Sequence, residues 1–391
     1  MRWGVRLRDF RARGNFCLSE SFKAQTGDFL AAPYKRMAAH PCPPARSTLS
    51  PLSLLMTAIE RPKAPQFDET SAFLSAIRER VGAVVVGQEV VVERILIALL
   101  TGGHLLLEGV PGLAKTLLVA AVSKTVRLDF ARVQFTIDLL PSDILGSEIL
   151  DQRDQTFRTH KGPIFTNLLL ADEINRAAPK VQSALLEAMQ ERRITIGNEN
   201  YGLPVPFLVI ATQNPVEQAG TFELPEAQLD RFMLLHRLRY LEPEDEKEVL
   251  RRNAKLGIKR DESGGAMVKT EFDMVDQGAV GGREDLAKAM EDVAQVHVSE
   301  TFIEHVMSIV QRTRDHPDLD LGASPRAGIS LVKASRARAL VHGRDYVVPE
   351  DLFALGEDVL LHRIRATYES LAEGRDARVI LEEILGERTS G

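Results

Sequence analysis

The feature that most constrains the fold of this chain is a short apolar run followed by a glycine-containing loop and a second apolar stretch. Residues 104–108 read His-Leu-Leu-Leu-Glu, residues 109–116 read Gly-Val-Pro-Gly-Leu-Ala-Lys-Thr, and residues 117–122 are all Leu, Val or Ala. This order predicts a buried strand, a tight loop and a helix. Such a loop turns its backbone N–H groups inward at the positive end of the helix, so the segment predicts an anion-binding site in an α/β sheet.

The loop matches the phosphate-binding pattern Gly, four residues, Gly-Lys-Ser/Thr at every position but one. Ala114 stands where the pattern has its last glycine, and its methyl group is small enough to allow the same geometry. We therefore expect the loop to bind ATP, with Lys115 reaching the β- and γ-phosphates and the Thr116 hydroxyl binding Mg²⁺. The predicted ATP-binding residues of the loop are Gly109, Val110, Pro111, Gly112, Leu113, Ala114, Lys115 and Thr116. The competing interpretation is a Gly/Pro turn with an incidental Lys-Thr pair.

A second apolar run, residues 168–171, ends in the acidic pair Asp172 and Glu173. The carboxyl edge of a buried strand is where doubly wound sheets place their ligand chemistry. We expect Asp172 to hold the magnesium shell and Glu173 to polarise the attacking water. The alternative is an acidic pair that only favours the dipole at a helix N-terminus.

Size and composition fit an ordinary soluble chain of two or three domains. The 391 residues are 44% hydrophobic and 27% charged, and no run approaches the 18 or so apolar residues of a membrane span. The net charge of −6 argues against broad nucleic-acid binding, which shows as a basic excess. Cys17 and Cys42 both precede the part that looks folded, so no disulfide framework serves the core. These observations predict a reduced, cytoplasmic protein.

The N-terminal segment differs from the rest of the chain. Residues 1–55 carry nine Lys or Arg against three Asp or Glu and show no helical or strand period. We expect a disordered basic extension that is an over-extended start, with the functional protein beginning at Met56; a transit peptide is the alternative. Beyond it we expect an α/β nucleotide-binding domain at 56–240, a helix and linker at 241–285, and a helical lid domain at 286–391.

Hydrophobic periodicity gives the expected elements. Strands at 104–108, 132–136, 168–171 and 207–212 alternate with helices at 115–127 and 179–192, which predicts a parallel sheet with helices on both faces. Helices at 70–82 and 89–102, joined by an extended piece at 84–88, precede this sheet. Two hairpins are expected as inserts, at about 144–162 and 193–206. After a charged helix at 242–254, residues 256–284 read as a linker, and helices follow at 301–314, 324–342, 349–360 and 379–385.

Nine motifs in one order resemble the MoxR family of AAA+ ATPases, in which an α/β core with hairpin inserts is followed by a small all-α lid. Ala114 is itself typical of that family. The resemblance covers roughly residues 68–365. The motifs are Gly109–Thr116, Gln134–Thr136, Asp138–Asp143, Gly162–Phe165, Leu168–Arg176, Ala184–Glu191, Ala211–Pro215, Leu224–Phe232 and Gly322–Ala327.

The resemblance implies roles for further residues. Asn214 is similar to the first sensor, which places the water, and the alternative is a turn-forming Asn before a proline. Arg231 is similar to the arginine finger that reaches a neighbouring subunit, and the alternative is a surface pair with Asp230. Arg326 is similar to the second sensor, closing on the phosphates of its own subunit; its alternative is an arginine that only begins a helix. The resemblance also implies that Val86, Gly87 and Gln88 pack near the adenine.

The same resemblance implies a homo-oligomeric ring, expected to be a hexamer, that hydrolyses ATP to remodel, activate or assemble client proteins. It also implies a partner with a von Willebrand factor A domain, and hairpins that face the pore or the partner. Two other functions stay open at this point. A nucleic-acid motor is disfavoured by the acidic balance of the chain. A small-molecule kinase using the same loop would leave Arg231 unexplained.

Overall fold

The computed structural model describes residues 67–386 except residues 111, 154, 216–219, 261–264 and 276–277. The predicted basic extension at 1–55 lies outside the described residues, so its expected disorder stays a prediction.

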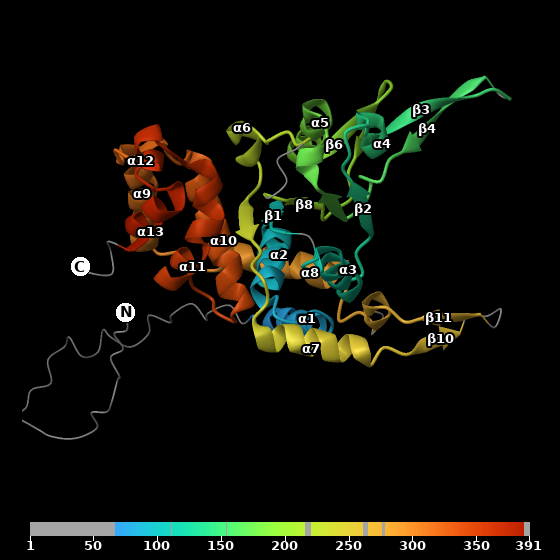
Figure 1. The fold of residues 1–391 in the computed structure, drawn as a ribbon, viewed down its shortest axis with the longest axis horizontal. Helices are drawn as coiled ribbons and strands as arrows, with labels where there is room; N and C mark the ends of the chain where they lie inside the picture. Colours follow the sequence, from blue (N-terminus) through green and yellow to red (C-terminus); the bar gives the residue numbers. More distant parts are fainter. Residues whose placement is uncertain are drawn as a thin grey trace, which may run out of the picture. The chain divides into compact units, whose positions relative to one another are not determined.

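A five-stranded parallel sheet forms the centre of the fold, as predicted (Figure 1). Its strand order is β2-β5-β8-β1-β9, so β1 pairs with β8 on one side and with β9 on the other. The strands are β1 Leu105–Glu108, β2 Phe130–Gln134, β5 Leu168–Asp172, β8 Leu208–Gln213 and β9 Leu234–Arg237. Nearly continuous apolar strands of this kind are typical of sheets covered on both faces. The edge strand β9 was not predicted, because only two of its four residues are apolar.

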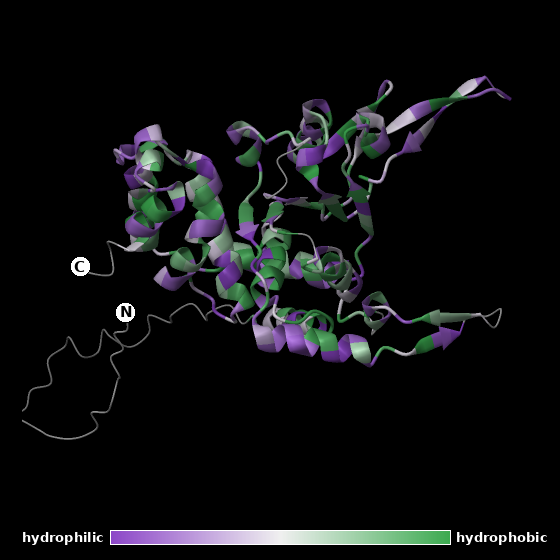
Figure 2. Cartoon of the chain, viewed as in Figure 1, coloured by the Kyte–Doolittle hydropathy of each residue, from purple (hydrophilic) through white to green (hydrophobic). Residues whose placement is uncertain are grey.

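Side chains from alternate strand positions enter two separate cores. Leu105 and Leu107 of β1 join the core under α1, α2 and α3, whereas Leu106 joins the core under α5. This is the period of two that a strand imposes on its side chains. The covering helices are α1 Asp68–Val84, α2 Glu89–Thr101, α3 Lys115–Thr125, α4 Pro141–Leu145 and α5 Pro179–Glu191. Figure 2 shows the apolar residues gathered along the sheet and these helices.

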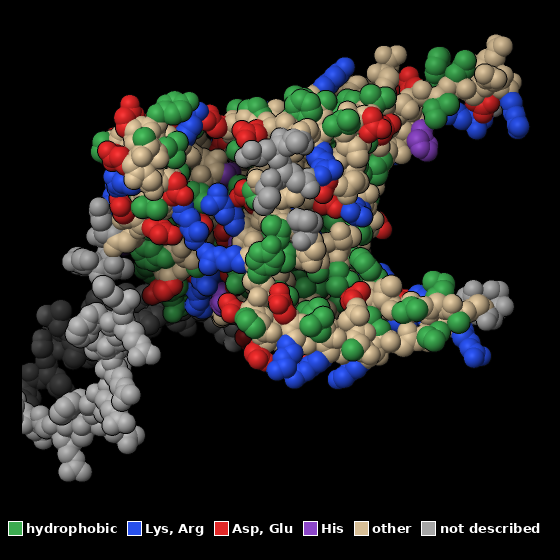
Figure 3. Space-filling view, viewed as in Figure 1, with side chains coloured by type: hydrophobic (Ala, Val, Ile, Leu, Met, Phe, Trp, Pro, Cys, Tyr) green, Lys and Arg blue, Asp and Glu red, His purple; other side chains and the backbone are tan. Residues whose placement is uncertain are grey.

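Both predicted hairpins are present as antiparallel pairs. One consists of β3 Gly146–Asp151 and β4 Thr156–Lys161, and the other of β6 Arg193–Ile196 and β7 Glu199–Gly202. Ile149, Leu150 and Phe157 on the β3–β4 hairpin are exposed. Figure 3 shows hydrophobic side chains on the surface of this projecting hairpin.

The segment expected to be a linker, 256–284, contains regular structure instead. After the hydrophilic helix α7 Pro243–Ala254, a third hairpin pairs β10 Ile258–Arg260 with β11 Ala266–Val268. A 3-10 turn, η3 Glu271–Met274, follows it, and helix α8 Arg283–Gln295, which was not predicted, begins before the linker was expected to end. Strands of three residues are too short to show a period in the sequence, which explains the wrong prediction.

The remaining chain is mainly helical, as predicted. Its elements are α9 Glu300–Asp315, β12 Leu319–Leu321, α10 Pro325–Val341, α11 Pro349–Leu360, η4 Leu361–Arg363, β13 Arg365–Ala366, α12 Tyr368–Ala372 and α13 Ala377–Gly386; the short α6 Glu226–Leu229 precedes β9. Leu331, Leu340, Leu355 and Ile380 are fully buried between these helices. Among the described helices, none is long and apolar enough to cross a membrane.

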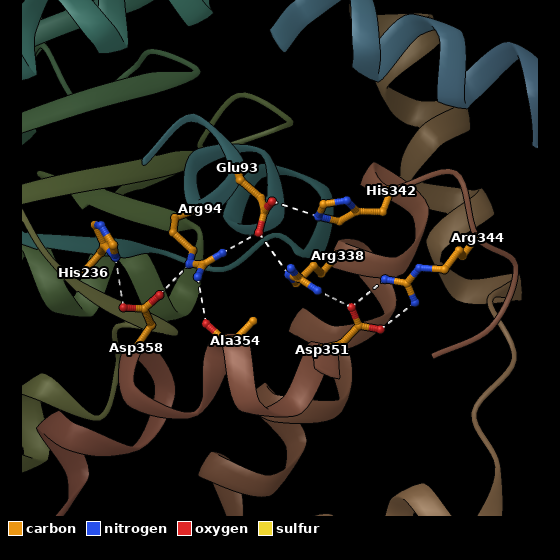
Figure 4. Close-up of polar contacts among 9 residues, drawn as sticks. All are labelled: Glu93, Arg94, His236, Arg338, His342, Arg344, Asp351, Ala354 and Asp358. Atoms are coloured by element: carbon orange, nitrogen blue, oxygen red, sulfur yellow. Dashed lines mark hydrogen bonds and ion pairs between the residues drawn. The ribbon is translucent and has the colours of Figure 1, made fainter. Parts of the chain in front are cut away.

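A buried chain of ion pairs joins the helical part to the core, starting from α2 (Figure 4). Glu93 of α2 faces three basic side chains. One is Arg94 on the same helix, and the others are Arg338 Nε at 3.1 Å and His342 Nε2 at 2.9 Å, at the end of α10. Burial opposes ionisation of Glu93, but the contacts with these three residues outweigh it and lower its pKa to about 2.

The same chain continues to α11 and to the sheet edge. Arg94 donates from Nε to Asp358, whose other carboxylate oxygen lies 3.0 Å from His236 Nδ1 on β9. Arg338 Nη1 donates to Asp351 Oδ1 over 2.6 Å. Buried ions are tolerated only with their partners in place, so the network holds α10 and α11 in one position against α2 and β9.

Candidate functional site

A cleft of about 950 Å³ lies at the carboxyl edge of the sheet, where β1, β5 and β8 end. Six of the predicted loop residues line it: Gly109, Gly112, Leu113, Ala114, Lys115 and Thr116. Val110 does not line the cleft, and Pro111 lies outside the described residues. The strand, loop and helix therefore place a phosphate-type loop at the mouth of a pocket large enough for a nucleotide.

Ala114 adopts a left-handed backbone conformation, with φ of 52°. This conformation costs an L-residue roughly 1–2 kcal/mol and is routine only for glycine. The general loop pattern has glycine here for that reason, and the chain accepts the strain with the smallest possible side chain. Ala114 also precedes Lys115, the first residue of α3, so the turn starts the helix at the loop.

Lys115 folds back onto the loop, where its Nζ donates to the Gly109 carbonyl over 2.7 Å. Burial lowers the pKa of its ammonium group, while the nearby carboxylates of Asp172 and Glu173 act in the opposite direction. The loop lysine and the acidic pair, 57 positions apart in the sequence, therefore share one pocket.

Both oxygens of the Asp172 carboxylate accept hydrogen bonds. Thr212 on the neighbouring strand β8 donates to Oδ1 over 2.6 Å, and Arg132 on β2 donates to Oδ2 over 2.6 Å. Thr212 also accepts from the backbone N–H of Glu173 over 2.9 Å. Strands on both sides of β5 thus orient Asp172, and its side chain is only 16% exposed.

Glu173 also has a left-handed backbone, with φ of 57°, and this strain lies at the residue predicted to polarise water. Its Oε2 accepts from Gln134 on β2 over 2.9 Å and lies 2.9 Å from Nε of Arg176. These contacts hold the carboxylate at the edge of the cleft.

Arg132, Gln134 and Thr212 line the cleft, but sequence reasoning assigned none of them a role. The sequence contained part of the information needed to find them. Arg132 and Gln134 stand two positions apart on one strand, which puts both side chains on the same face. The pairing of β2 with β5 decides whether this face meets Asp172. In that pairing, Gln134 is the register partner of Asp172.

Asn214 follows β8, is buried and lines the cleft beside Gln213. At the other end, Val86 and Gln88 line it, while Gly87 does not. Residues 85–87 form a bend, in place of the extended piece predicted at 84–88. Gly87 has φ of 69°, a backbone conformation that favours glycine, and a Cβ there would lie 2.7 Å from the Asp245 carboxylate of α7, which would have to move.

The donor set in the cleft fits a magnesium ion that arrives with a nucleotide. No group of three or more His, Cys, Asp or Glu that could hold a metal occurs among the described residues. Mg²⁺ is typically held by one or two carboxylates together with substrate phosphates. Thr116 and Asp172, which both line the cleft, supply a hydroxyl and a carboxylate for such an ion.

Arg231 and Arg326 lie elsewhere, in a second, smaller pocket of about 240 Å³ between α5 and α10 that Lys333 and Arg363 also line. Neither arginine lines the large cleft. In this arrangement Arg326 lies outside the large cleft, and its closing on the phosphates of its own subunit stays a prediction.

The suggested surface pair of Asp230 with Arg231 does not form either. Asp230 Oδ1 instead accepts from Arg363 Nε over 2.8 Å, and its Oδ2 lies 3.7 Å from Arg326 Nη1. Arg231 donates from Nε to Gln190 on α5 over 3.2 Å. The two predicted arginines are therefore together, on a face separate from the large cleft.

Comparison with known protein families identifies both parts of the chain. Residues 104–234 match the model of the ATPase family associated with various cellular activities (AAA), and residues 311–384 match the AAA lid domain. The first match covers β1, β2, β5 and β8, together with the phosphate loop and the acidic pair, and ends at the first residue of β9.

Individual relatives resemble the chain over most of its length. Chaperone MoxR1 of Mycobacterium tuberculosis is 42% identical over 311 residues, which is 77% of this chain and 78% of that protein. Protein MoxR of Methylorubrum extorquens is 30% identical over 312 residues, 76% of this chain and 88% of that protein. A crystal structure of a protein from Cytophaga hutchinsonii superposes with a TM-score of 0.72 at 43% identity, covering 81% of this chain and 94% of that one.

Proposed function

Because the chain belongs to the MoxR family of AAA ATPases, we propose that it works as a ring of identical subunits, expected to be six, that hydrolyses Mg²⁺-bound ATP to remodel, activate or assemble client proteins. The relative from Mycobacterium tuberculosis is named a chaperone, which supports a client-directed role. We place the protein in the cytoplasm.

The observation that supports the proposed ring is that the two arginines lie apart from the cleft. Arg231 and Arg326 line one pocket, while Lys115, Asp172 and Glu173 line another. An arginine that stabilises the charge on a transferring phosphate must reach it directly. In a head-to-tail ring the arginine face of one subunit meets the cleft of the next, and both arginines then act on the neighbour's ATP.

Within one subunit, the cleft residues take the remaining roles. Lys115 and the loop N–H groups bind the phosphates, and Thr116 and Asp172 hold the magnesium ion, which neutralises phosphate charge when bound. Glu173 accepts hydrogen bonds at the edge of the cleft and would polarise the attacking water, with Asn214 placing that water. Arg132, which donates to Asp172, keeps that carboxylate in its orientation.

The projecting hairpins are the parts that we assign to clients and partners. The β3–β4 hairpin carries apolar side chains that the subunit leaves exposed. Large exposed apolar groups of this kind mark interaction sites. A partner with a von Willebrand factor A domain belongs to the same proposal.

Mixing of inactive subunits tests the ring and the position of Arg326 together. Glu173→Gln subunits keep both arginines, and Arg326→Ala subunits keep Glu173. In a mixed ring, some Arg326→Ala clefts face an intact Arg326 from a Glu173→Gln neighbour. We expect each variant alone to hydrolyse ATP poorly and the mixture to recover part of the activity.

Arg231→Ala mixed with Glu173→Gln serves as the parallel measurement for the arginine finger. Failure of the Arg326→Ala mixture to recover, while the Arg231→Ala mixture recovers, would place Arg326 in its own subunit's site. ATPase activity that is independent of protein concentration through the assembly range would contradict the ring itself.

A further inference from the structure

We infer that the segment after the β10–β11 hairpin provides a base-binding platform in the nucleotide cleft, with Phe272 as the aromatic side chain on which the adenine ring stacks. The inference rests on the proposed ATP site, and it assigns a ligand contact to a stretch that reads as a linker in the sequence.

The cleft has two chemically different ends. One end holds the phosphate loop, Arg132, Asp172 and Glu173. The segments that form the other end contribute mostly apolar side chains, those of Val84, Val85, Val86, Leu241, Val249, Leu250, Phe272 and Met274, together with the polar Gln88, Glu246, Arg252 and Glu271. ATP is divided in the same way, into a charged triphosphate and a flat, largely apolar base. With the triphosphate on Lys115, the base therefore lies toward the apolar end.

Phe272 is the aromatic residue among the apolar cleft residues, and the subunit does not bury it. Its exposed fraction is 48%, and Leu250 of α7 beside the same cleft is 71% exposed. Apolar side chains that line a concave pocket and stay open to solvent are typical of ligand sites. An aromatic ring in this position supplies the π face that stacks with any base.

The backbone that carries Phe272 is held from several sides. Its own carbonyl accepts from the Val275 N–H over 3.2 Å, and the Thr270 N–H donates to Asp273 Oδ2 over 2.8 Å, closing the turn. Glu271 accepts a hydrogen bond from Asn253 of α7, and Asp273 pairs with Lys259 of β10.

The turn also packs on the helix that starts at the phosphate loop, since η3 contacts α3 and the partly buried Met274 joins the core beneath. The platform is therefore pre-organised relative to Lys115, and stacking requires little ordering of the chain.

Two substitutions test the platform. Phe272→Ala should weaken ATP and ADP binding by about five- to a hundred-fold, the range that loss of one base–aromatic stack produces. Inorganic tripolyphosphate, which has no base, should compete for the phosphate end with unchanged affinity. Because stacking accepts every base, GTP should lose affinity by a similar factor. Calorimetry of each compound measures these values.

Phe272→Trp provides a spectroscopic readout. The chain has a single tryptophan, Trp3, so a Trp3→Phe background leaves position 272 as the only indole. We expect this variant to keep its ATP affinity and its fluorescence to be quenched by ATP and ADP but not by tripolyphosphate. The matched control is Tyr368→Ala, an 87% exposed aromatic of α12, which should leave every affinity unchanged.

The inference is overturned if Phe272→Ala binds ATP as the unmodified chain does, if it loses tripolyphosphate as strongly as ATP, or if the tryptophan does not respond to ATP. Lys115→Ala separates this failure from failure of the ATP site. If only the platform is wrong, Lys115→Ala still abolishes binding. If Lys115→Ala also binds ATP normally, the proposed site itself is wrong.

Discussion

Arg326 Nη1 lies 3.7 Å from Asp230 Oδ2, so the first turn of α10 meets the residue directly before Arg231. Asp230 also holds the buried Arg363 and accepts a hydrogen bond from Ser324, the residue before α10. The Asp230 carboxylate therefore holds the start of the lid helix α10 beside Arg231, the predicted arginine finger. Both arginines line the same small pocket, which is separate from the large cleft.

Lys115→Ala and Glu173→Gln should separate binding from hydrolysis. Removing the ammonium group that we propose to reach the phosphates should abolish ATP binding. Replacing the Glu173 carboxylate by an amide should leave binding intact and lower kcat by about 10²–10⁴-fold, as loss of a general base does. Calorimetry and a steady-state phosphate-release assay measure the two quantities. Full turnover in Glu173→Gln would contradict the mechanism.

Ala114→Gly should stabilise the protein by about 1 kcal/mol, because glycine adopts the φ of 52° found there without the strain of a Cβ. Chemical denaturation measures the free energy of unfolding. Ala120→Gly, in the interior of α3, is the control and should have the opposite sign, losing about 1 kcal/mol. Destabilisation by Ala114→Gly of the size seen for Ala120→Gly would show that position 114 is not strained.

Glu93→Gln should destabilise the protein by about 3 kcal/mol or more, because it leaves Arg94 and Arg338 buried without their shared carboxylate. The control is Glu69→Gln, which removes one partner of the exposed pair with Lys288 and should leave the unfolding midpoint nearly unchanged. If the two variants have equal effects, the network does not fix the lid against the core.

Stability should fall when the pH drops from about 6.5 toward 4. Burial lowers the pKa of His104 to about 4, from 6.5 in the unfolded chain. Between these values the unfolded state binds the extra proton, so acid favours unfolding. The contribution of His104 is fully present above pH 6.5, and on the order of 2 kcal/mol is lost by pH 5. The pKa of buried His362 is lowered well below its usual value and adds in the same direction.

Urea unfolding at pH 7.5 and pH 5 measures this dependence. His104→Gln, with an amide that hydrogen-bonds without titrating, should reduce it. His160→Gln on the exposed β3–β4 hairpin should not. A pH dependence that is identical in all three proteins would rule out His104 as its source.

The elements with long apolar runs were predictable. The strand before the phosphate loop, the strand that ends in the acidic pair and the lid helices each carry their own local signal, and the predicted elements agree with the structure. The short strand β9, the β10–β11 hairpin and helix α8 were missed. Their formation depends on what they pack against, and a few residues in a Gly-rich, charged stretch show no period.

The sequence by itself therefore determined the parallel sheet, the loop at 109–116 and the residues that accompany it, because backbone turns and buried strands are local properties of the chain. The tertiary structure decided which of these residues meet. Arg132 reaches Asp172 through the pairing of β2 with β5, and Phe272 enters the cleft through a turn locked to α7. Arg326 lies beside Asp230 and outside the large cleft, a position that depends on contacts between segments far apart in the sequence.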